Sequence, residues 1–259
     1  MTSVGNGRFR DQVAVITGGA QGIGFATAQL FAREGATLAL IDINGEKVDA
    51  AAAHLAGSGA DTRACTADLS KEEDVDRAFA QILDAFGHID VLVNLASIYP
   101  FISLEETSLQ DWHEILAANL DSTFLCCRTV LPHMKDRRYG RIVNTSSGTV
   151  VIGIGGLSAY VATKSAVIGF TRSIAREAGE HGITANVIMP GLIATDHVLT
   201  MFDDELATNA FFDETIAQQC IKRRGQPEDI AHGIAYLASR EASFVTGETL
   251  YVGGGYGFA

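Results

Sequence analysis

Short apolar runs alternate with stretches of helical periodicity along almost the whole chain. Runs typical of buried strands occur at 13–16, 37–41, 62–66, 91–93, 141–144, 183–189 and 249–252. Between them, apolar residues recur at helical spacing at 23–31, 45–55, 71–86, 112–134, 159–180 and 227–238. This alternation is typical of a parallel sheet with helices on both faces. We therefore predict an α/β fold with a doubly wound parallel sheet of about seven strands.

The 259 residues have room for one large domain or two small ones. We find no internal repeat, linker or low-complexity tract, so we predict one domain over residues 11–259, after a flexible tail at 1–10. The pattern is interrupted at 191–221 by a mixed apolar and acidic stretch. This segment is longer than an ordinary connection, which makes it a candidate lid over a substrate.

The charge balance argues against nucleic acid or a membrane surface as the main partner. Acidic side chains number 31 against 19 basic ones, for a net charge of −12, which repels phosphate backbones and anionic headgroups. The first eleven residues lack a hydrophobic signal region and no long apolar run occurs, so we expect a cytoplasmic protein. The four cysteines and seven histidines show no metal-ligand spacing, and we predict no metal.

A glycine-rich turn, Thr-Gly-Gly-Ala-Gln-Gly-Ile-Gly at 17–24, separates the first predicted strand from the first helix. Glycine lets backbone N–H groups approach a pyrophosphate at a helix N-terminus. Glycines also gather in ordinary turns, so the cluster alone does not decide between the two interpretations. Its place between a strand and a helix favours a dinucleotide, and the predicted contacts are Gly18, Gln21, Gly22, Ile23 and Gly24.

Asp42 ends the second predicted strand, where a carboxylate can accept hydrogen bonds from an adenosine ribose. The same carboxylate repels a 2′-phosphate, and no Lys or Arg lies at 37–45 to attract one. The residue therefore favours NAD(H) over NADP(H). The alternative is an ordinary Asp at the start of the next helix.

Tyr160 and Lys164 lie four residues apart on a predicted helix, so their side chains share one face. A free tyrosine is a poor base at neutral pH because its pKa is about 10. A neighbouring ammonium and an oxidised nicotinamide ring lower such a pKa, so that Tyr160 could exchange a proton with an alcohol. Taken alone, a Tyr and a Lys at this spacing are common and mostly structural.

The motifs together carry more information than any one of them. They comprise the turn at 17–24, Asp42, Asn94-Leu95-Ala96-Ser97, Asn119, Asn144-Thr145-Ser146-Ser147, Tyr160, Lys164 and Pro190-Gly191. In this order and spacing, the chain resembles the short-chain dehydrogenase/reductase family from Asp11 to Gly255. The resemblance implies a Rossmann-like fold. It also implies a homotetramer built through the helices at 119–134 and 159–180 and the C-terminal segment.

The resemblance further implies roles for individual residues. Ser147 would hydrogen-bond the substrate oxygen, Lys164 the nicotinamide ribose, and Asn119 would hold a water linking Lys164 to solvent. Further cofactor contacts are implied for Ile43, Asp68, Leu69, Asn94, Ala96, Pro190, Gly191, Ile193 and Thr195. Leu95 and Ser97 depart from the usual Asn-Asn-Ala-Gly motif, which puts the cofactor contacts beside them in doubt.

The stretches expected around the substrate, 97–103, 149–157 and 192–212, contain no Lys or Arg. A charged substrate normally requires a cation, so we predict a neutral, fairly apolar secondary alcohol or ketone. Expected substrate contacts are Tyr99, Ser147, Ile154 and Tyr160, with apolar residues such as Met201 and Phe202 nearby. One alternative is an NADPH-dependent 3-oxoacyl-(acyl-carrier-protein) reductase. The other is a noncatalytic, cofactor-sensing scaffold, which would be expected to lose Ser147, Tyr160 or Lys164.

Overall fold

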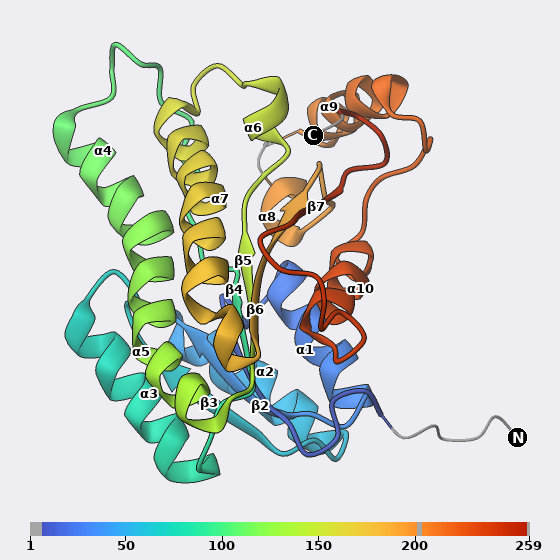
Figure 1. The fold of residues 1–259 in the computed structure, drawn as a ribbon. Helices are drawn as coiled ribbons and strands as arrows, with labels where there is room; N and C mark the ends of the chain where they lie inside the picture. The colour runs from blue at the N-terminus through green and yellow to red at the C-terminus, as the bar shows by residue number, and fades with distance from the viewer. Residues whose placement is uncertain (1–6, 201–203, 258–259) are drawn as a thin grey trace, which may run out of the picture.

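A computed structural model describes residues 7–200 and 204–257 and contains one sheet of seven parallel strands. The strand order is β3-β2-β1-β4-β5-β6-β7, which confirms the predicted doubly wound α/β fold (Figure 1). The strands are β1 (Val13–Thr17), β2 (Thr37–Asp42), β3 (Thr62–Thr66), β4 (Val91–Asn94), β5 (Gly140–Thr145), β6 (Ile183–Pro190) and β7 (Thr249–Val252). Residues 1–6 of the expected tail, and Met201 and Phe202, lie outside the described residues.

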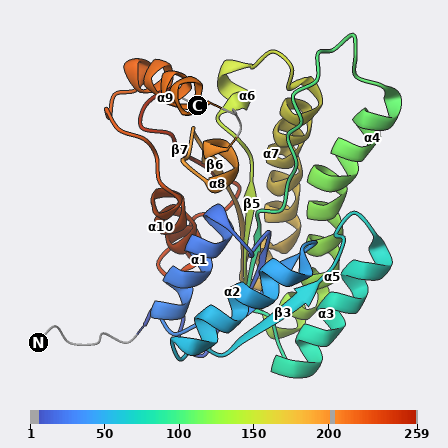
Figure 2. The same ribbon diagram turned by 180° about the vertical axis from the view of Figure 1, so that it is seen from behind.

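Helices cover both faces of the sheet, as Figures 1 and 2 show from opposite sides. The helices are α1 (Gly22–Arg33), α2 (Gly45–Gly57), α3 (Glu72–Phe86), α4 (Leu109–Leu116), α5 (Ser122–Arg137), α6 (Thr149–Ile152), α7 (Ser158–Ala178), α8 (Asp196–Leu199), α9 (Glu205–Gln218) and α10 (Pro227–Ala238). Helices α1, α2 and α10 pack on one face, and α3, α5 and α7 on the other. None of the helices among the described residues has the length and apolar character needed to cross a membrane.

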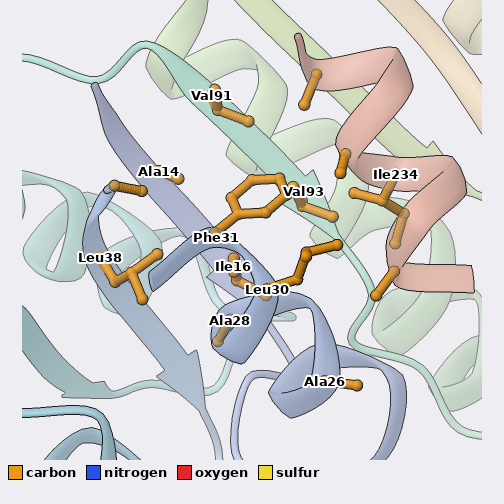
Figure 3. Close-up of a cluster of buried hydrophobic side chains, with 14 of the residues drawn as sticks. Ala14, Ile16, Ala26, Ala28, Leu30, Phe31, Leu38, Val91, Val93 and Ile234 are labelled. Atoms are coloured by element: carbon orange, nitrogen blue, oxygen red, sulfur yellow. The ribbon is translucent and has the colours of Figure 1, made fainter. Parts of the chain in front are cut away.

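The core consists of two layers, because successive side chains of a strand point to opposite faces. Ala14 and Ile16 of β1 belong to the layer under α1 and α10, whereas Val15 belongs to the opposite layer. Figure 3 shows the first layer, with Phe31 of α1 packed against the strands and Ile234 of α10 beside it. Strands buried on both faces explain why the sequence shows continuous apolar runs instead of alternation.

The flexible tail expected at residues 1–10 extends too far, because Arg8 and Phe9 are held against the rest of the chain. Phe9 is fully buried and stacks on Phe31, with the ring centroids 4.1 Å apart. Arg8 forms an ion pair with Glu34, and the Phe9 N–H donates to the Glu34 carbonyl. The apolar gain from one buried aromatic ring holds this segment on α1, although the surrounding sequence is polar.

The segment between β6 and α10 is more helical than the irregular pattern at 191–221 predicts. It contains α8, whose first turn is capped by the Thr195 side chain, and α9, capped by Asp204. Helix α9 buries Thr208, Phe212 and Thr215, which are too sparse to give a clear helical stripe. Another difference is the short helix α6, which the sequence analysis did not predict.

Candidate active site at the carboxyl ends of the strands

The glycine-rich turn leaves β1 at the point where the strand order reverses, between β1 and β4. Gly18 and Gly22 have positive φ angles of 64° and 55°, which only glycine adopts readily. A Cβ on Gly24 would lie 2.0 Å from the Gly18 carbonyl oxygen, so α1 begins directly against the turn. The Thr17 hydroxyl accepts hydrogen bonds from the N–H groups of Leu95 and Ala96, at 3.0 and 3.2 Å. These two bonds join the turn to the segment directly after β4, despite the unusual Leu95.

Asp42 lies beside this turn at the end of β2. Its carboxylate accepts hydrogen bonds from the N–H groups of Ala20, at 3.2 Å, and Asn44, at 3.1 Å. Ile43, the next predicted contact, is largely exposed at the same edge. Asp42 therefore faces the turn, where an adenosine ribose would have to lie.

Lys47 is a residue of this region that the sequence analysis missed. Its ammonium group donates a hydrogen bond of 2.8 Å to the side-chain oxygen of Gln21 in the glycine-rich turn. Lys47 lies in the first turn of α2, just beyond the stretch 37–45 that was searched for cations. A signal that could have revealed Lys47 is its place in the first turn of the helix that directly follows Asp42.

Tyr160, Ser147 and Lys164 lie together where β5 ends and α7 begins. Lys164 is buried, its ammonium donates a 3.1 Å hydrogen bond to the Thr145 carbonyl, and it lies 5.7 Å from the centre of the Tyr160 ring. The Ser147 hydroxyl accepts from the Thr149 N–H and hydroxyl, at 3.2 and 3.0 Å. Ser146 instead donates to the Lys164 carbonyl and ties β5 to α7.

The pKa shifts in this group do not follow the simple expectation. Burial raises the pKa of Tyr160, and a hydrogen bond with Ser147 works in the opposite direction. Burial lowers the pKa of Lys164 to about 8. The expected lowering of the tyrosine pKa is therefore wrong for the chain by itself, because desolvation outweighs its polar neighbours. Each of these shifts favours the neutral form of its side chain.

Asn119 lies in a π-helical turn, Ala117–Asp121, between α4 and α5. Its side chain accepts from the Ile98 N–H and donates to the Ile98 carbonyl, both at 2.8 Å. A third hydrogen bond of 3.4 Å goes to the Thr163 hydroxyl on α7. Asn119 thus joins the loop after β4 to the helix that carries Tyr160 and Lys164.

Tyr99, in the loop after β4, and Thr195, in the segment after β6, lie beside the site. The Tyr99 ring lies 5.7 Å from the Tyr160 ring, between centroids, and its hydroxyl lies near the Thr195 side chain. A Cβ on Gly22 would lie 3.3 Å from the Thr195 methyl group, so the start of α8 lies against the glycine-rich turn. His197 of α8, which the sequence analysis did not single out, contacts Tyr99 edge to face at 4.8 Å.

Other predicted cofactor contacts already have partners within the chain. The Asn94 amide nitrogen donates to the Asn144 side chain at 2.8 Å, although the Asn94 side-chain oxygen is buried without a partner. The Asp68 carboxylate bonds Ser70 and pairs with Lys71 at 3.1 Å. Leu69 points into the core. The segments that carry these residues therefore reach the site, but the side chains themselves bond or pack within the chain.

The remaining predicted residues lie at and after the end of β6 and in the loop before α7. The Pro190 carbonyl accepts from the Gly148 N–H at 2.7 Å, and a Cβ on Gly191 would lie 2.6 Å from the Gly253 Cα. Ile193 forms a bridge with Gly225 and packs its side chain into the core. Ile154 is half-buried in the loop between α6 and α7.

These residues fit a nicotinamide dinucleotide. The turn at 18–24 is shaped by glycines that no side chain could replace without strain or collision, and Asp42 and Lys47 frame its outer end. Tyr160, Ser147 and Lys164 lie at the other end of the same strand edge. Among residues 7–200 and 204–257, no group of three His, Cys, Asp or Glu side chains could hold a metal ion.

Comparison with known proteins decides the family. A family model described as enoyl-(acyl carrier protein) reductase matches residues 18–257. The subunit BbsD of (2S)-[(R)-hydroxy(phenyl)methyl]succinyl-CoA dehydrogenase from Thauera aromatica is 39% identical, over 95% of this chain and 96% of the relative. The chain belongs to the short-chain dehydrogenase/reductase family. It is therefore an oxidoreductase of a family that uses nicotinamide cofactors.

Further relatives within the short-chain dehydrogenase/reductase family differ in what their names say they act on. A 3-oxoacyl-[acyl-carrier-protein] reductase, FabG of Vibrio cholerae, is 36% identical over 94% of this chain and 96% of its own. The crystal structure of levodione reductase matches with a TM-score of 0.88 and 32% identity, over 95% of this chain and 98% of the other. The similarity therefore establishes the reaction class and leaves the substrate to be argued from the site.

Proposed function

We propose that the protein is an NAD(H)-dependent oxidoreductase that interconverts a neutral, fairly apolar secondary alcohol and its ketone. One observation carries the proposal: Tyr160 lies beside Ser147 and the buried Lys164, and the described segments expected around the substrate contribute no Lys or Arg of their own. Among the described residues of 97–103, 149–157 and 192–212, none is Lys or Arg. A charged substrate would lose its hydration there without a counter-charge in exchange.

A nicotinamide ring bound beside these residues would supply or accept the hydride. The Tyr160 hydroxyl donates its proton to the carbonyl oxygen during reduction, and takes it back during oxidation. Ser147, whose hydroxyl bonds Thr149, hydrogen-bonds the same substrate oxygen and holds the reacting carbon in place. In its protonated form, Lys164 stabilises the tyrosinate that Tyr160 becomes after it gives up its proton. Because burial lowers the pKa of Lys164 to about 8, the Lys164 ammonium can exchange its own proton near neutral pH.

The preference for NAD(H) rests on Asp42. Its carboxylate accepts the Ala20 N–H and lies where a ribose diol can donate to it, whereas a 2′-phosphate would meet negative charge. Lys47, bonded to Gln21, offsets part of that repulsion. We therefore expect NAD(H) to be preferred and NADP(H) to bind measurably.

The thioester alternative has support from two relatives whose names contain CoA or acyl-carrier protein. Their substrates carry phosphate groups, which favour cations at the entrance of a site. The described substrate-side segments of this chain offer none, so we favour the neutral ketone. Ser147, Tyr160 and Lys164 are all present, which argues against the noncatalytic scaffold.

The test is an assay of NADH and NADPH oxidation with purified protein on neutral aryl, cyclic and linear ketones and on an acyl-CoA thioester. The proposal expects turnover of at least one neutral ketone with NADH. Turnover restricted to the thioester with NADPH would replace it with the thioester reductase. Cofactor binding without turnover of any compound would favour the scaffold.

We also propose that the protein is a homotetramer. Support comes from apolar surface on α5, one of the helices expected at the subunit contacts: Phe124 is 42% exposed and its ring lies 6.2 Å from that of Phe170 on α7. A partly exposed aromatic pair on two neighbouring helices is typical of an interface. Sedimentation equilibrium tests it, and a monomer at micromolar concentration would refute it.

A further inference from the structure

Three aromatic rings from three separate segments form a row beside the site. Tyr99, from the loop after β4, lies in the middle, with Tyr160 of α7 on one side and His197 of α8 on the other. The centroid distances are 5.7 Å and 4.8 Å, with the Tyr99 and His197 rings nearly perpendicular at 87°. We refer to Tyr160, Tyr99 and His197 as the aromatic row.

Hydrogen bonds within and around its loop hold Tyr99, the middle residue of the row. The two hydrogen bonds between Asn119 and the Ile98 backbone fix the residue immediately before Tyr99. A few residues later, the Ile102 N–H donates to the Gly156 carbonyl at 2.9 Å, which joins this loop to the one before α7. The backbone is therefore fixed both before and after Tyr99, which holds the Tyr99 ring next to the Tyr160 ring.

The outer end of the row belongs to α8. Thr195 caps this helix by accepting the Val198 N–H at 3.4 Å, and its side chain lies near the Tyr99 hydroxyl. Val198 is buried, which anchors the helix, while His197 is exposed. The row therefore leads from the ring of Tyr160 to an exposed side chain of α8.

The charges of the residues in and beside the aromatic row disfavour an anion. Burial raises the pKa of Tyr99 to about 12, so its hydroxyl stays neutral. The acid residue Asp196 precedes His197 on the same helix, and Lys and Arg are absent from 191–200 and 204–212. Neutral rings attract other rings through offset or edge-to-face contacts.

We propose that Tyr99 and His197 form a wall that binds a planar, uncharged ring attached to the carbinol carbon of the substrate. His197 is then a specificity-determining residue, which selects aryl or flat cyclic ketones over linear ones of equal size. This inference rests on the proposed function and names the substrate class of the same site.

The test compares two eight-carbon ketones, acetophenone and 2-octanone, with NADH as cofactor. The wild type is expected to have the higher kcat/KM for acetophenone. In His197→Leu, the ratio of the two kcat/KM values is expected to fall about fivefold, mainly through KM for acetophenone. His197→Phe keeps an edge-to-face partner for Tyr99 and should restore the ratio. His113→Leu, at an exposed position on α4, is the matched control and should leave both values unchanged.

The outcomes separate this inference from the proposed function. An unchanged ratio in His197→Leu would overturn the inference, as would an equal loss for both ketones, which would mean that His197 supports the lid only. Preference of the wild type for 2-octanone would also overturn it, while leaving the ketone reductase intact. Failure of both ketones together with turnover of an acyl-CoA thioester would refute the proposed function itself.

Discussion

The cofactor side and the substrate side of the site are built in different ways. On the cofactor side, backbone packs on backbone: a Cβ on Gly24 would lie 2.0 Å from the Gly18 carbonyl oxygen, and one on Gly18 would lie 3.0 Å from the Ala96 nitrogen. On the substrate side, Gly153 and Gly155 have open space where a Cβ would go. The first side tolerates one backbone shape, whereas the second can change its side chains and accept different substrates.

The largest expected effect is on chemistry, where the two sides meet. Tyr160→Phe removes the hydroxyl that exchanges the proton, and we expect turnover to fall about a thousandfold. NADH binding, followed by fluorescence, should stay within a few-fold of wild type because the turn at 17–24 is untouched. Turnover near the wild-type level with intact cofactor binding would contradict the role of Tyr160.

The charge balance at the cofactor side comes next. Asp42→Ala removes the carboxylate that opposes a 2′-phosphate and leaves Lys47 in place, so we expect the ratio of the Kd values for NADP(H) and NAD(H) to shift about a hundredfold toward NADP(H). In Asp42→Ala/Lys47→Gln, a part of this shift should be lost, and the salt dependence of NADPH binding should weaken. An unchanged ratio after the loss of Asp42 would remove its ribose role.

A pair of glycine substitutions sharpens the contrast between the sides. Gly24→Ala forces a methyl group against the Gly18 carbonyl, and we expect it to cost about 1–3 kcal/mol in the free energy of unfolding. Gly155→Ala, which meets nothing within 4 Å and has an ordinary φ, should change it by less than about 0.5 kcal/mol. Urea denaturation of both variants measures this. Equal costs would show that the two sides do not differ in packing.

A further effect concerns the pH dependence of stability. Because burial lowers the pKa of Lys164 to about 8 from 10.5, the unfolded chain binds a proton between these values that the folded chain has released. This group therefore makes the free energy of unfolding rise with pH in that window. In urea denaturation, the free energy of unfolding of the wild type minus that of Lys164→Met should therefore rise between pH 7.5 and pH 9.5. Other titrating groups cancel in this difference, and a difference that stays constant with pH would contradict the shift.

The same contrast explains how far sequence alone could go. The glycine-rich turn, Asp42 and the Tyr160/Lys164 pair are local patterns whose geometry follows from strand, turn and helix, so they could be predicted with their positions. The aromatic row joins 99, 160 and 197, and no local pattern shows that these positions meet. His197 was missed for that reason, whereas Lys47 was missed because it lies two residues beyond the stretch 37–45 in which cations were considered. Helix α9 was missed because its few buried residues form no stripe.

Burial explains the remaining errors. Phe9 was assigned to a flexible tail because its neighbours are polar, yet one ring stacked on Phe31 is enough to hold the segment. The direction of the Tyr160 pKa shift was wrong because spacing on a helix indicates which charges are near, and not how much water is removed. Desolvation is a property of the whole fold, so it becomes visible only when all segments are in place.

The most direct test of the account follows NADH oxidation at 340 nm with acetophenone and cyclic ketones, in wild type and in Tyr160→Phe, with NADPH in parallel. The account predicts turnover in wild type that favours NADH and is lost in Tyr160→Phe while NADH still binds. Wild-type activity that is confined to NADPH and acyl thioesters would contradict it.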